Sequence, residues 1–280
     1  MADKVTVPQI KARKVSEGSE PVVMITAYDA GFGSIVDDGG VDLILVGDSV
    51  AMVELGRPDT LTVTVDEIAH HVKAVAAVDP SALIVGDLPW MSFHVSAEET
   101  VRNAATLIRA GAGCVKLEGG HKRVPMIEAI LDCEIPVMGH IGLTPQSTLA
   151  FGGYRVQGRD IDRARSLVED AKALQEAGCF AIVIEGVPDL VAREITQAID
   201  IPTVGIGAGV HCDGQVLVMH DMLGLNTGHL PRFVRVYADI RTPAVDAVKQ
   251  YVADVKSGAF PNDDESYHMS QEARQALGLE

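Results

Sequence analysis

Eight short, continuously apolar runs alternate with helical patterns along this chain of 280 residues. Each run is too short for a helix, and unbroken apolarity is typical of parallel strands that are buried on both faces. The runs cover residues 22–28, 43–47, 83–87, 114–118, 136–141, 180–185, 203–207 and, with a less regular pattern, 216–225. Strict alternation of strand and helix predicts an α/β fold that closes into a (β/α)8 TIM barrel, with a doubly wound open sheet as the alternative.

The segments between the runs carry recognisable helix boundaries. Thr64 and Glu67 form a capping box ahead of a helix that extends to about residue 78, and Ser96 and Glu99 form a second box. An apolar stripe with helical spacing also runs through residues 161–177. Helices of this kind, placed between strands, would form the outer layer of a barrel.

The length of the chain fits one barrel without a linker or an internal repeat. We therefore expect a single domain over residues 1–280, with a short N-terminal cap over 1–20 and a polar C-terminal tail over 261–280. Residues 142–160 contain several glycines and no packing period. Because loops of that length are often functional, we predict that this segment is a mobile lid.

Charge and cysteine usage exclude several classes of function. The formal net charge is −16, whereas nucleic acids and anionic membranes bind basic surfaces. No apolar stretch is long enough to span a bilayer and no signal-peptide pattern is visible, so we predict a cytoplasmic protein. The four cysteines lack CxxC spacing, and we expect Cys114 and Cys179 to be buried, reduced thiols with no zinc or disulfide.

Polar side chains recur where the predicted strands end. The residues are Asp48, Ser49, Asp87, Lys116, Glu118, His140 and Glu185. Each has a simpler interpretation on its own: an aspartate can cap a helix, a lysine and glutamate two positions apart can form an ion pair, and a single histidine can be a hydrogen-bonded core residue. In a barrel, however, all of these strand ends meet at one rim, which is where active sites lie.

Together these side chains indicate a particular kind of chemistry. Two aspartates and a glutamate, without a cluster of histidine or cysteine, make an oxygen-only site that favours Mg²⁺ over zinc. A lysine beside such a metal can hold a carboxylate or a developing enolate. Glu185, separate from the other acids, is a candidate general base. The predicted reaction class is proton abstraction beside a metal-bound keto group, followed by formation or cleavage of a carbon–carbon bond.

At these same positions the chain resembles the ketopantoate (3-methyl-2-oxobutanoate) hydroxymethyltransferase family. The matching phrases follow the family's order over essentially the whole chain: ITAYDAGF (25–32), VGDSVAMVELG (46–56), VGDLPWMSF (85–93), VKLEGG (115–120), MGHIGLTPQS (138–147), IEGVP (184–188), IPTVGIGAG (201–209), CDGQVLVMHDMLGL (212–225) and GAFPNDDESY (258–267). The resemblance implies a barrel of the phosphoenolpyruvate/isocitrate-lyase type. It also implies Mg²⁺-dependent transfer of a hydroxymethyl group from 5,10-methylenetetrahydrofolate to 3-methyl-2-oxobutanoate, giving 2-dehydropantoate for pantothenate synthesis.

The resemblance also implies a role for each matched residue. Asp48 and Asp87 would bind the metal, and Glu118 would complete its site, directly or through water. Glu185 would remove the C3 proton of the keto acid. The residues that would contact the keto acid are Asp48, Ser49, Asp87 and Lys116. The family typically assembles as a large homo-oligomer, so a decamer is expected, with a 2-oxo acid and a folate as its small-molecule partners.

Two departures from the family pattern lie near the expected mouth of the barrel. Residues 57–60 read Arg-Pro-Asp-Thr where the family more often has an aromatic residue and serine, and Trp90 replaces a more common phenylalanine. We expect both to affect packing beside the substrate. Two other functions remain as alternatives. One is a Mg²⁺-dependent 2-oxo acid lyase or mutase of the same superfamily, although this sequence lacks the K-K-C-G-H phrase that carries the catalytic cysteine of the lyases. The other is a non-catalytic barrel that binds a keto acid.

Overall fold

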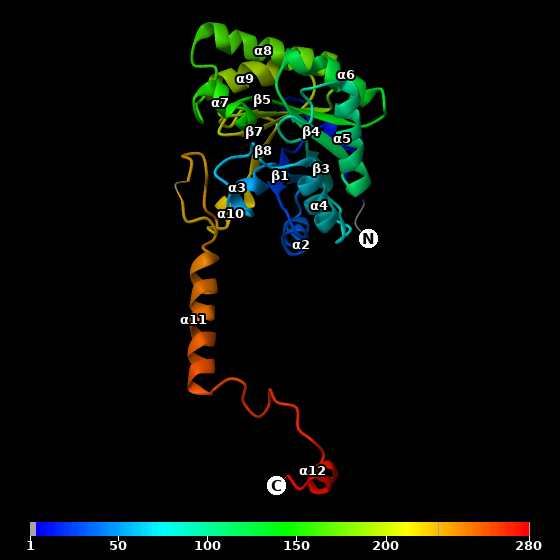
Figure 1. The fold of residues 1–280 in the computed structure, drawn as a ribbon. Coiled ribbons are helices and arrows are strands. Elements are labelled where there is room, and N and C mark those ends of the chain that lie inside the picture. The colour runs from blue at the N-terminus through cyan, green and yellow to red at the C-terminus, as the bar shows by residue number, and fades with distance from the viewer. Residues whose placement is uncertain (1–3, 229, 280) are drawn as a thin grey trace.

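The computed structural model describes residues 4–228 and 230–279, and it shows a closed barrel of eight parallel strands (Figure 1). Each strand pairs with its neighbours in sequence, and the last strand closes on the first. The strands are β1 (Val22–Thr26), β2 (Leu43–Val46), β3 (Leu83–Asp87), β4 (Cys114–Glu118), β5 (Val137–Gly142), β6 (Ala181–Glu185), β7 (Thr203–Ile206) and β8 (Gly214–Leu217). The predicted barrel is therefore confirmed, and the open sheet is excluded.

Helices surround the barrel and connect consecutive strands. The α-helices are α1 (Val7–Lys11), α2 (Ala30–Asp38), α3 (Val50–Val53), α4 (Val65–Ala76), α5 (Ala97–Ala110), α6 (Val124–Leu131), α7 (Thr148–Phe151), α8 (Ile161–Glu176), α9 (Asp189–Ala198), α10 (Met219–Met222), α11 (Arg241–Ser257) and α12 (Gln271–Leu277). Short 3-10 turns are η1 (Val15–Glu17), η2 (His121–Arg123) and η3 (Pro145–Ser147). The Thr64–Glu67 capping box opens α4 as predicted, and the Ser96 hydroxyl accepts from the Glu99 amide at the start of α5.

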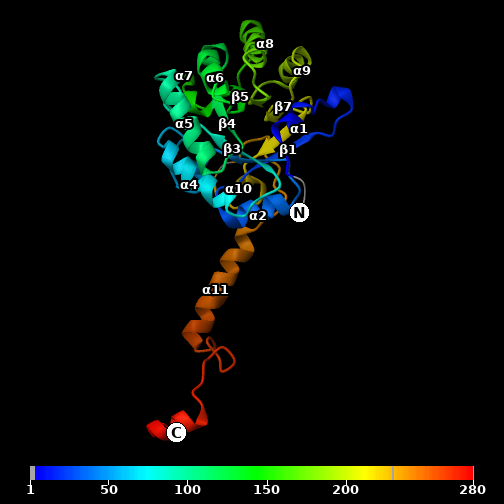
Figure 2. The ribbon, with the colours of Figure 1, turned by 90° about the vertical axis from the view of Figure 1, so that its right-hand side faces the viewer.

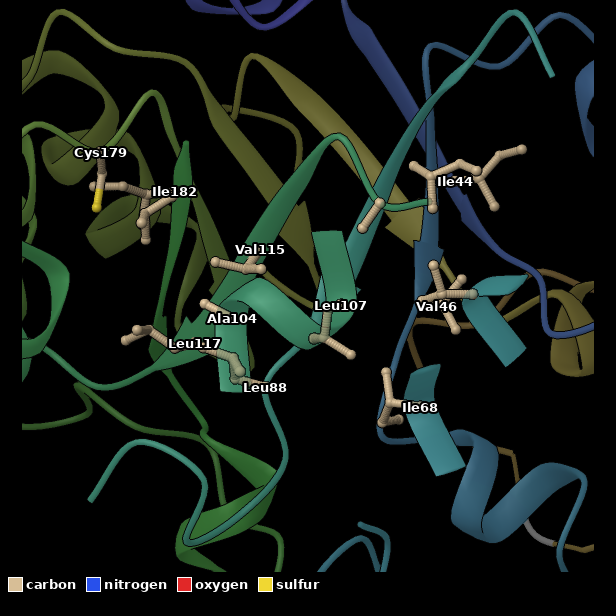
Figure 3. Packing of buried hydrophobic residues seen from close by; sticks show 14 of the residues in the cluster. Ile44, Val46, Ile68, Leu88, Ala104, Leu107, Val115, Leu117, Cys179 and Ile182 are labelled. Carbon is tan, nitrogen blue, oxygen red and sulfur yellow. The ribbon is translucent and has the colours of Figure 1, made fainter. Parts of the chain in front are cut away.

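Apart from the exposed Val23 on β1 and Gln215 on β8, the strands are largely buried on both faces, and each face belongs to a different core. On β2, Leu43 and Leu45 point into the barrel, whereas Ile44 and Val46 pack outward against the helices. Figure 3 shows this outer layer, in which Ile44 and Val46 lie on the helix side of the barrel wall. Because side chains alternate along a strand, alternate residues face the barrel interior, which decides which polar groups can meet there.

The N-terminal segment covers the end of the barrel where the strands begin. Ile10 of α1 is fully buried against the inner core. The Lys14 ammonium lies 2.9 Å from the Asp213 carboxylate and donates to the carbonyl of Thr196 at 2.8 Å. A buried lysine needs such partners, so this ion pair anchors the segment to the start of β7 and β8.

The chain after β7 differs most from the sequence-based expectation. The last predicted run, 216–225, is split between the short strand β8 and helix α10. Helix α11, which the strand pattern did not predict, projects away from the barrel and contributes no buried residue (Figures 1 and 2). Helix α12 lies within the region expected to be a polar tail. Within the described ranges, no helix has both the length and the apolarity needed to cross a membrane.

All four cysteines are free thiols. Cys114 and Cys179 are buried, as predicted, and Cys212 is buried too, whereas Cys133 is exposed. Burial raises the pKa of the Cys179 thiol to about 12, so this thiol is unreactive at neutral pH.

Candidate active site

A cavity of about 810 Å³, called here the central cavity, opens at the ends of the strands. It is lined by every polar residue that the sequence placed at this rim, namely Asp48, Ser49, Asp87, Lys116, Glu118, His140 and Glu185. Those on β3 to β6 alternate with outward-facing residues such as Val115 and Leu117, so they share the inward face of their strands. The structure therefore brings the predicted site residues into one place.

Three carboxylates form the acidic side of the central cavity. Asp48, Asp87 and Glu118 are each at most 5% exposed, and the Asp48 amide donates to Asp87 Oδ2 at 3.1 Å. Burial is the main cause that raises the pKa of Asp48 well above its ordinary value, and repulsion from Asp87 and Glu118 raises it further. The group thus holds more negative charge than its own hydrogen bonds stabilise.

Lys116 is the counter-charge inside this acidic group. Its ammonium lies 2.8 Å from Asp87 Oδ1, and both side chains are almost completely buried. Burial lowers the pKa of Lys116, but attraction to Asp87, Glu118 and Asp48 outweighs it and raises the pKa above its ordinary value. One ammonium facing three carboxylates leaves the site suited to a second cation.

The donor set fits a hard divalent cation with water in its shell. Across residues 4–228 and 230–279, no three acidic, histidine or cysteine side chains converge closely enough to hold a metal ion by themselves. Mg²⁺, however, is usually bound by only one or two carboxylates and keeps several waters. Asp48 and Asp87 are adjacent and repel each other, so they could supply the one or two carboxylates that Mg²⁺ needs. Glu118 already accepts a hydrogen bond from the backbone amide of Gln146 at 3.0 Å.

His140 connects the acidic group to Glu185. Its Nδ1 lies 3.3 Å from the Lys116 ammonium and 3.5 Å from Glu118 Oε1, and its Nε2 lies 3.3 Å from Glu185 Oε2. Burial and the Lys116 charge lower the pKa of His140, but contacts with Glu118 and Glu185 outweigh both and raise it to about 9. Through this contact the imidazole ring can orient the Glu185 side chain.

Glycine at the end of β5 fixes the backbone of Glu185. Gly142 pairs in register with Glu185 and has φ +98°, and a Cβ there would lie 2.2 Å from the Glu185 carbonyl oxygen. The next amide, of Leu143, donates to that same oxygen at 2.7 Å. Only glycine allows this close approach, so Gly142 helps to place the Glu185 side chain at the cavity mouth.

Gln146 is the main site residue to which sequence reasoning gave no role. Its side-chain amide donates to Asp48 Oδ2 at 2.9 Å and to the Leu88 carbonyl at 3.0 Å, while its backbone amide donates to Glu118. It therefore contacts two of the three acids at once. The residue was visible in the T-P-Q-S phrase, but a glutamine carries no chemical signal of its own, and its partner Asp48 is 98 positions away.

Ser49 follows Asp48 at the start of α3, and its hydroxyl lies 2.8 Å from the Tyr28 hydroxyl. Tyr28 is buried, and desolvation raises the pKa of its phenol, so it stays protonated. The His71 ring in turn contacts the Tyr28 carbonyl at 2.7 Å. This chain of contacts holds the Ser49 hydroxyl at the cavity wall.

The two departures from the family pattern occupy different environments. Thr60 lines the central cavity, is 2% exposed, and has a hydroxyl without a hydrogen-bond partner among the described residues. Arg57 instead points to α4, where it pairs with Glu67 and donates to the Thr62 carbonyl at 3.0 Å. Trp90 is 39% exposed and is not among the residues lining the central cavity. Of Arg57, Thr60 and Trp90, only Thr60 lines the central cavity, where it could contact a substrate.

Residues 142–160 form a wall of the central cavity and are called here the partition segment. Leu143, Pro145, Tyr154 and Val156 line the central cavity. The segment is mostly buried over 142–146 and buried again at 157–158, and it is more exposed over 147–156 and at 159–160. A lid movement of residues 142–160 stays a prediction, and the more exposed residues 147–156 are the part best placed to move.

Comparisons with known proteins show which family the whole chain resembles. The model of the ketopantoate hydroxymethyltransferase family matches residues 4–263. A 3-methyl-2-oxobutanoate hydroxymethyltransferase from Syntrophomonas wolfei is 49% identical over 275 residues, which is 98% of this chain and 99% of that protein. One from Ignicoccus hospitalis is 52% identical over 260 residues, covering 93% of this chain and 98% of its own length.

Solved structures with the same fold are more distant in sequence. A 2,3-dimethylmalate lyase, described as a member of the PEP mutase/isocitrate lyase superfamily, aligns with a TM-score of 0.60 at 15% identity, covering 98% of this chain and 95% of that one. A phosphonopyruvate hydrolase complexed with oxalate and Mg²⁺ aligns with a TM-score of 0.58 at 14% identity over 98% and 95% of the two chains. These likenesses show the same β/α-barrel fold.

Proposed function

The chain belongs to the ketopantoate hydroxymethyltransferase family, and from that premise we propose how its central cavity performs the reaction. It is an enzyme of the pantothenate pathway that transfers a hydroxymethyl group to 3-methyl-2-oxobutanoate. We propose that the one-carbon unit comes from 5,10-methylenetetrahydrofolate. The C3–H bond of the keto acid breaks, a bond forms from C3 to the methylene carbon, water supplies the hydroxyl oxygen, and tetrahydrofolate leaves.

The observation that carries this proposal is that the central cavity is large and is lined by apolar side chains as well as by the acidic group. A cavity of about 810 Å³ is far larger than a five-carbon keto acid needs and lies in the range of roughly 300–1,000 Å³ that suits ligands with ring systems. Its apolar wall includes Met52, Tyr154, Val156, Leu230 and Phe233. This wall supports binding of the folate rings beside a keto acid held near the acidic group.

We propose that Mg²⁺ would be held by Asp48 and Asp87, with Glu118 reached through water. When bound, the metal would polarise the keto group and so make the C3 proton more acidic. The chain's own groups would orient the substrate at the same end. Asp48, Asp87 and the Ser49 hydroxyl line the keto acid subsite, and Lys116 would attract the substrate carboxylate and stabilise developing negative charge.

Glu185 is the proposed general base. It is the inward-facing residue at the end of β6 and lies apart from Asp48 and Asp87, which leaves its carboxylate free to face C3 of the substrate. The His140 ring, 3.3 Å away, would orient this carboxylate and disperse charge as the proton moves. After proton removal, the enolate would attack the methylene carbon of the folate lying along the apolar wall.

One assay tests both the Mg²⁺ requirement and the folate donor. It measures the formation of 2-dehydropantoate from 3-methyl-2-oxobutanoate and 5,10-methylenetetrahydrofolate, with and without EDTA. Activity should fall on chelation and return with Mg²⁺, and Asp87→Asn should shift the Mg²⁺ dependence to much higher concentration. Asp221→Asn is a control, because Asp221 lines the same cavity but lies on α10, away from the acidic group. Full activity of Asp87→Asn at limiting Mg²⁺ would overturn the metal assignment.

We further propose that the protein is a homo-oligomer, a decamer by the resemblance, in the cytoplasm. Helix α11 supports association because it leaves the barrel without a covering layer (Figure 2). Val248, Tyr251, Val252 and Val255 recur at helical spacing and are each at least 42% exposed. An exposed apolar stripe of this kind is typical of an interface, here with a second copy of the chain.

A further inference from the structure

Three hydroxyl groups form a row, called here the hydroxyl row, that ends at the wall of the central cavity. Thr26 is the last residue of β1, Tyr28 follows two positions later, and Ser49 comes directly before α3. The Tyr28 hydroxyl lies 2.8 Å from the Ser49 hydroxyl, and the Thr26 hydroxyl also hydrogen-bonds to this phenol. Thr26 and Ser49 line the central cavity, whereas Tyr28 is 1% exposed and lies behind them. Tyr28 can therefore affect a bound ligand only through its neighbours.

A backbone amide at the start of the hydroxyl row favours one direction for its hydrogen bonds. The Met219 amide donates to Thr26 Oγ1 at 3.0 Å. Since an N–H group can only donate, the threonine oxygen is already an acceptor, and its proton is left to donate onward. One arrangement then gives each group a partner: Thr26 donates to Tyr28, and Tyr28 donates to Ser49. In that arrangement the Ser49 proton has no partner within the row and is left for the cavity.

The phenol in the middle of the hydroxyl row is held in place by a second ring. The ring centres of Tyr28 and His220 are 5.8 Å apart, and His220 Nε2 lies 3.0 Å from Glu54 Oε1. Ser49 precedes α3 and Glu54 follows it, so the two packed rings contact both ends of this helix. An isolated helix of four residues is not stable in water. These contacts therefore decide where the Ser49 hydroxyl lies.

A fixed donor is useful at this place because the surroundings are acidic. Asp48, Asp87 and Glu118 would repel the carboxylate of a keto acid. The Lys116 ammonium is already paired with Asp87 Oδ1 at 2.8 Å. In the proposed site the metal takes the keto group of the substrate, which leaves the substrate carboxylate as the charged group that needs a hydrogen-bond donor.

We propose that Thr26 and Tyr28 are positioning residues that hold the Ser49 hydroxyl as a donor to the carboxylate of the keto acid. Without the phenol, the Ser49 hydroxyl would be free to rotate and to donate to a group of the protein instead of the ligand. The inference rests on the proposed keto acid subsite at Ser49. It predicts that Tyr28 strengthens binding of the keto acid, that it does so only through Ser49, and that it takes no part in the chemical step.

The test is a double-mutant cycle on the dissociation constant of 3-methyl-2-oxobutanoate, measured by calorimetry in Mg²⁺. Tyr28→Phe removes one oxygen and should raise Kd roughly 3–10-fold, the usual effect of one neutral hydrogen bond, with kcat unchanged. In the Ser49→Ala background the same change should have no effect. Tyr237→Phe is the matched control, because it loses the same atom from an exposed side chain outside the central cavity, and it should keep the wild-type Kd.

A second arm tests the first link of the hydroxyl row. Thr26→Val should raise Kd in the wild type but not in Tyr28→Phe, and Thr26→Ser should recover most of the affinity that Thr26→Val loses. If both substitutions weaken binding independently, Thr26 acts on the ligand directly and the row is refuted.

Other results would also overturn the proposal. A wild-type Kd in Tyr28→Phe, or a full loss of affinity that persists in the Ser49→Ala background, would show that Tyr28 does not act through Ser49. A lower kcat with an unchanged Kd would place the donor on the developing enolate and not on the carboxylate. A wild-type Kd in Ser49→Ala would instead overturn the keto acid subsite itself, and the role of the row with it.

Discussion

Replacing Lys116 with methionine tests the electrostatic account of the central cavity. The change keeps the length of the side chain but removes the ammonium that lies 2.8 Å from Asp87 Oδ1 in a site where both side chains are at most 4% exposed. Removing one partner of a buried ion pair typically costs about 3–5 kcal/mol, because the other charge is left without compensation. Here three carboxylates would be left together, so we expect a loss of that size in the free energy of unfolding.

The assay is thermal unfolding in EDTA and in Mg²⁺. For a domain of this size, the loss corresponds to a melting temperature lower by about 6–10 °C in EDTA. Mg²⁺ should narrow the gap to the wild type, because a divalent cation that binds the folded state supplies the missing charge. Lys172→Met is the control: its pair with Glu169 spans 2.9 Å but is largely exposed, and should contribute less than about 1 kcal/mol.

Melting of Lys116→Met within about 1 °C of the wild type in EDTA would refute this reasoning. A difference in melting temperature between Lys116→Met and the wild type that Mg²⁺ leaves unchanged would also refute it, since the carboxylates would then not be the cause of the instability.

Two further substitutions test how the site is held in place. Gly142→Ala should fold but lower kcat on the order of 10²-fold, because the new Cβ would displace the Glu185 backbone. An unchanged kcat would contradict this. Gln146→Leu should weaken Mg²⁺ binding, measured by calorimetry, by about 10–100-fold, because it removes the hydrogen bond that orients Asp48. Gln157→Leu, in the same segment but without a contact to the acids, should leave that affinity unchanged.

The fold and the positions of the site residues could be predicted because both depend on local pattern. Continuous apolarity marked the strands, and alternation along β4 required Lys116 and Glu118 to face the same side. Once the strands are parallel and closed, their ends must meet. The acids, Lys116 and Glu185 then share a cavity without any knowledge of long-range contacts.

Features that depend on non-local contact could not be predicted in this way. The bonds of Gln146 to Asp48 and Glu118 join distant parts of the chain, and the partition segment has no sequence period. Arg57 was expected beside the substrate, but it pairs with Glu67 of α4 instead. Helix α11, in contrast, carries a local signal, because its apolar residues recur at positions i, i+3, i+4 and i+7.

Proton exchange at C3 of 3-methyl-2-oxobutanoate tests the central claim, that Glu185 is the base, most directly. With Mg²⁺ and tetrahydrofolate in D₂O, the wild type should exchange this proton for deuterium. Glu185→Gln should bind Mg²⁺ and the keto acid normally but exchange on the order of 10²–10⁴-fold more slowly, the usual cost of losing a general base. Exchange at the wild-type rate would show that another group removes the proton, with His140 the next residue to examine.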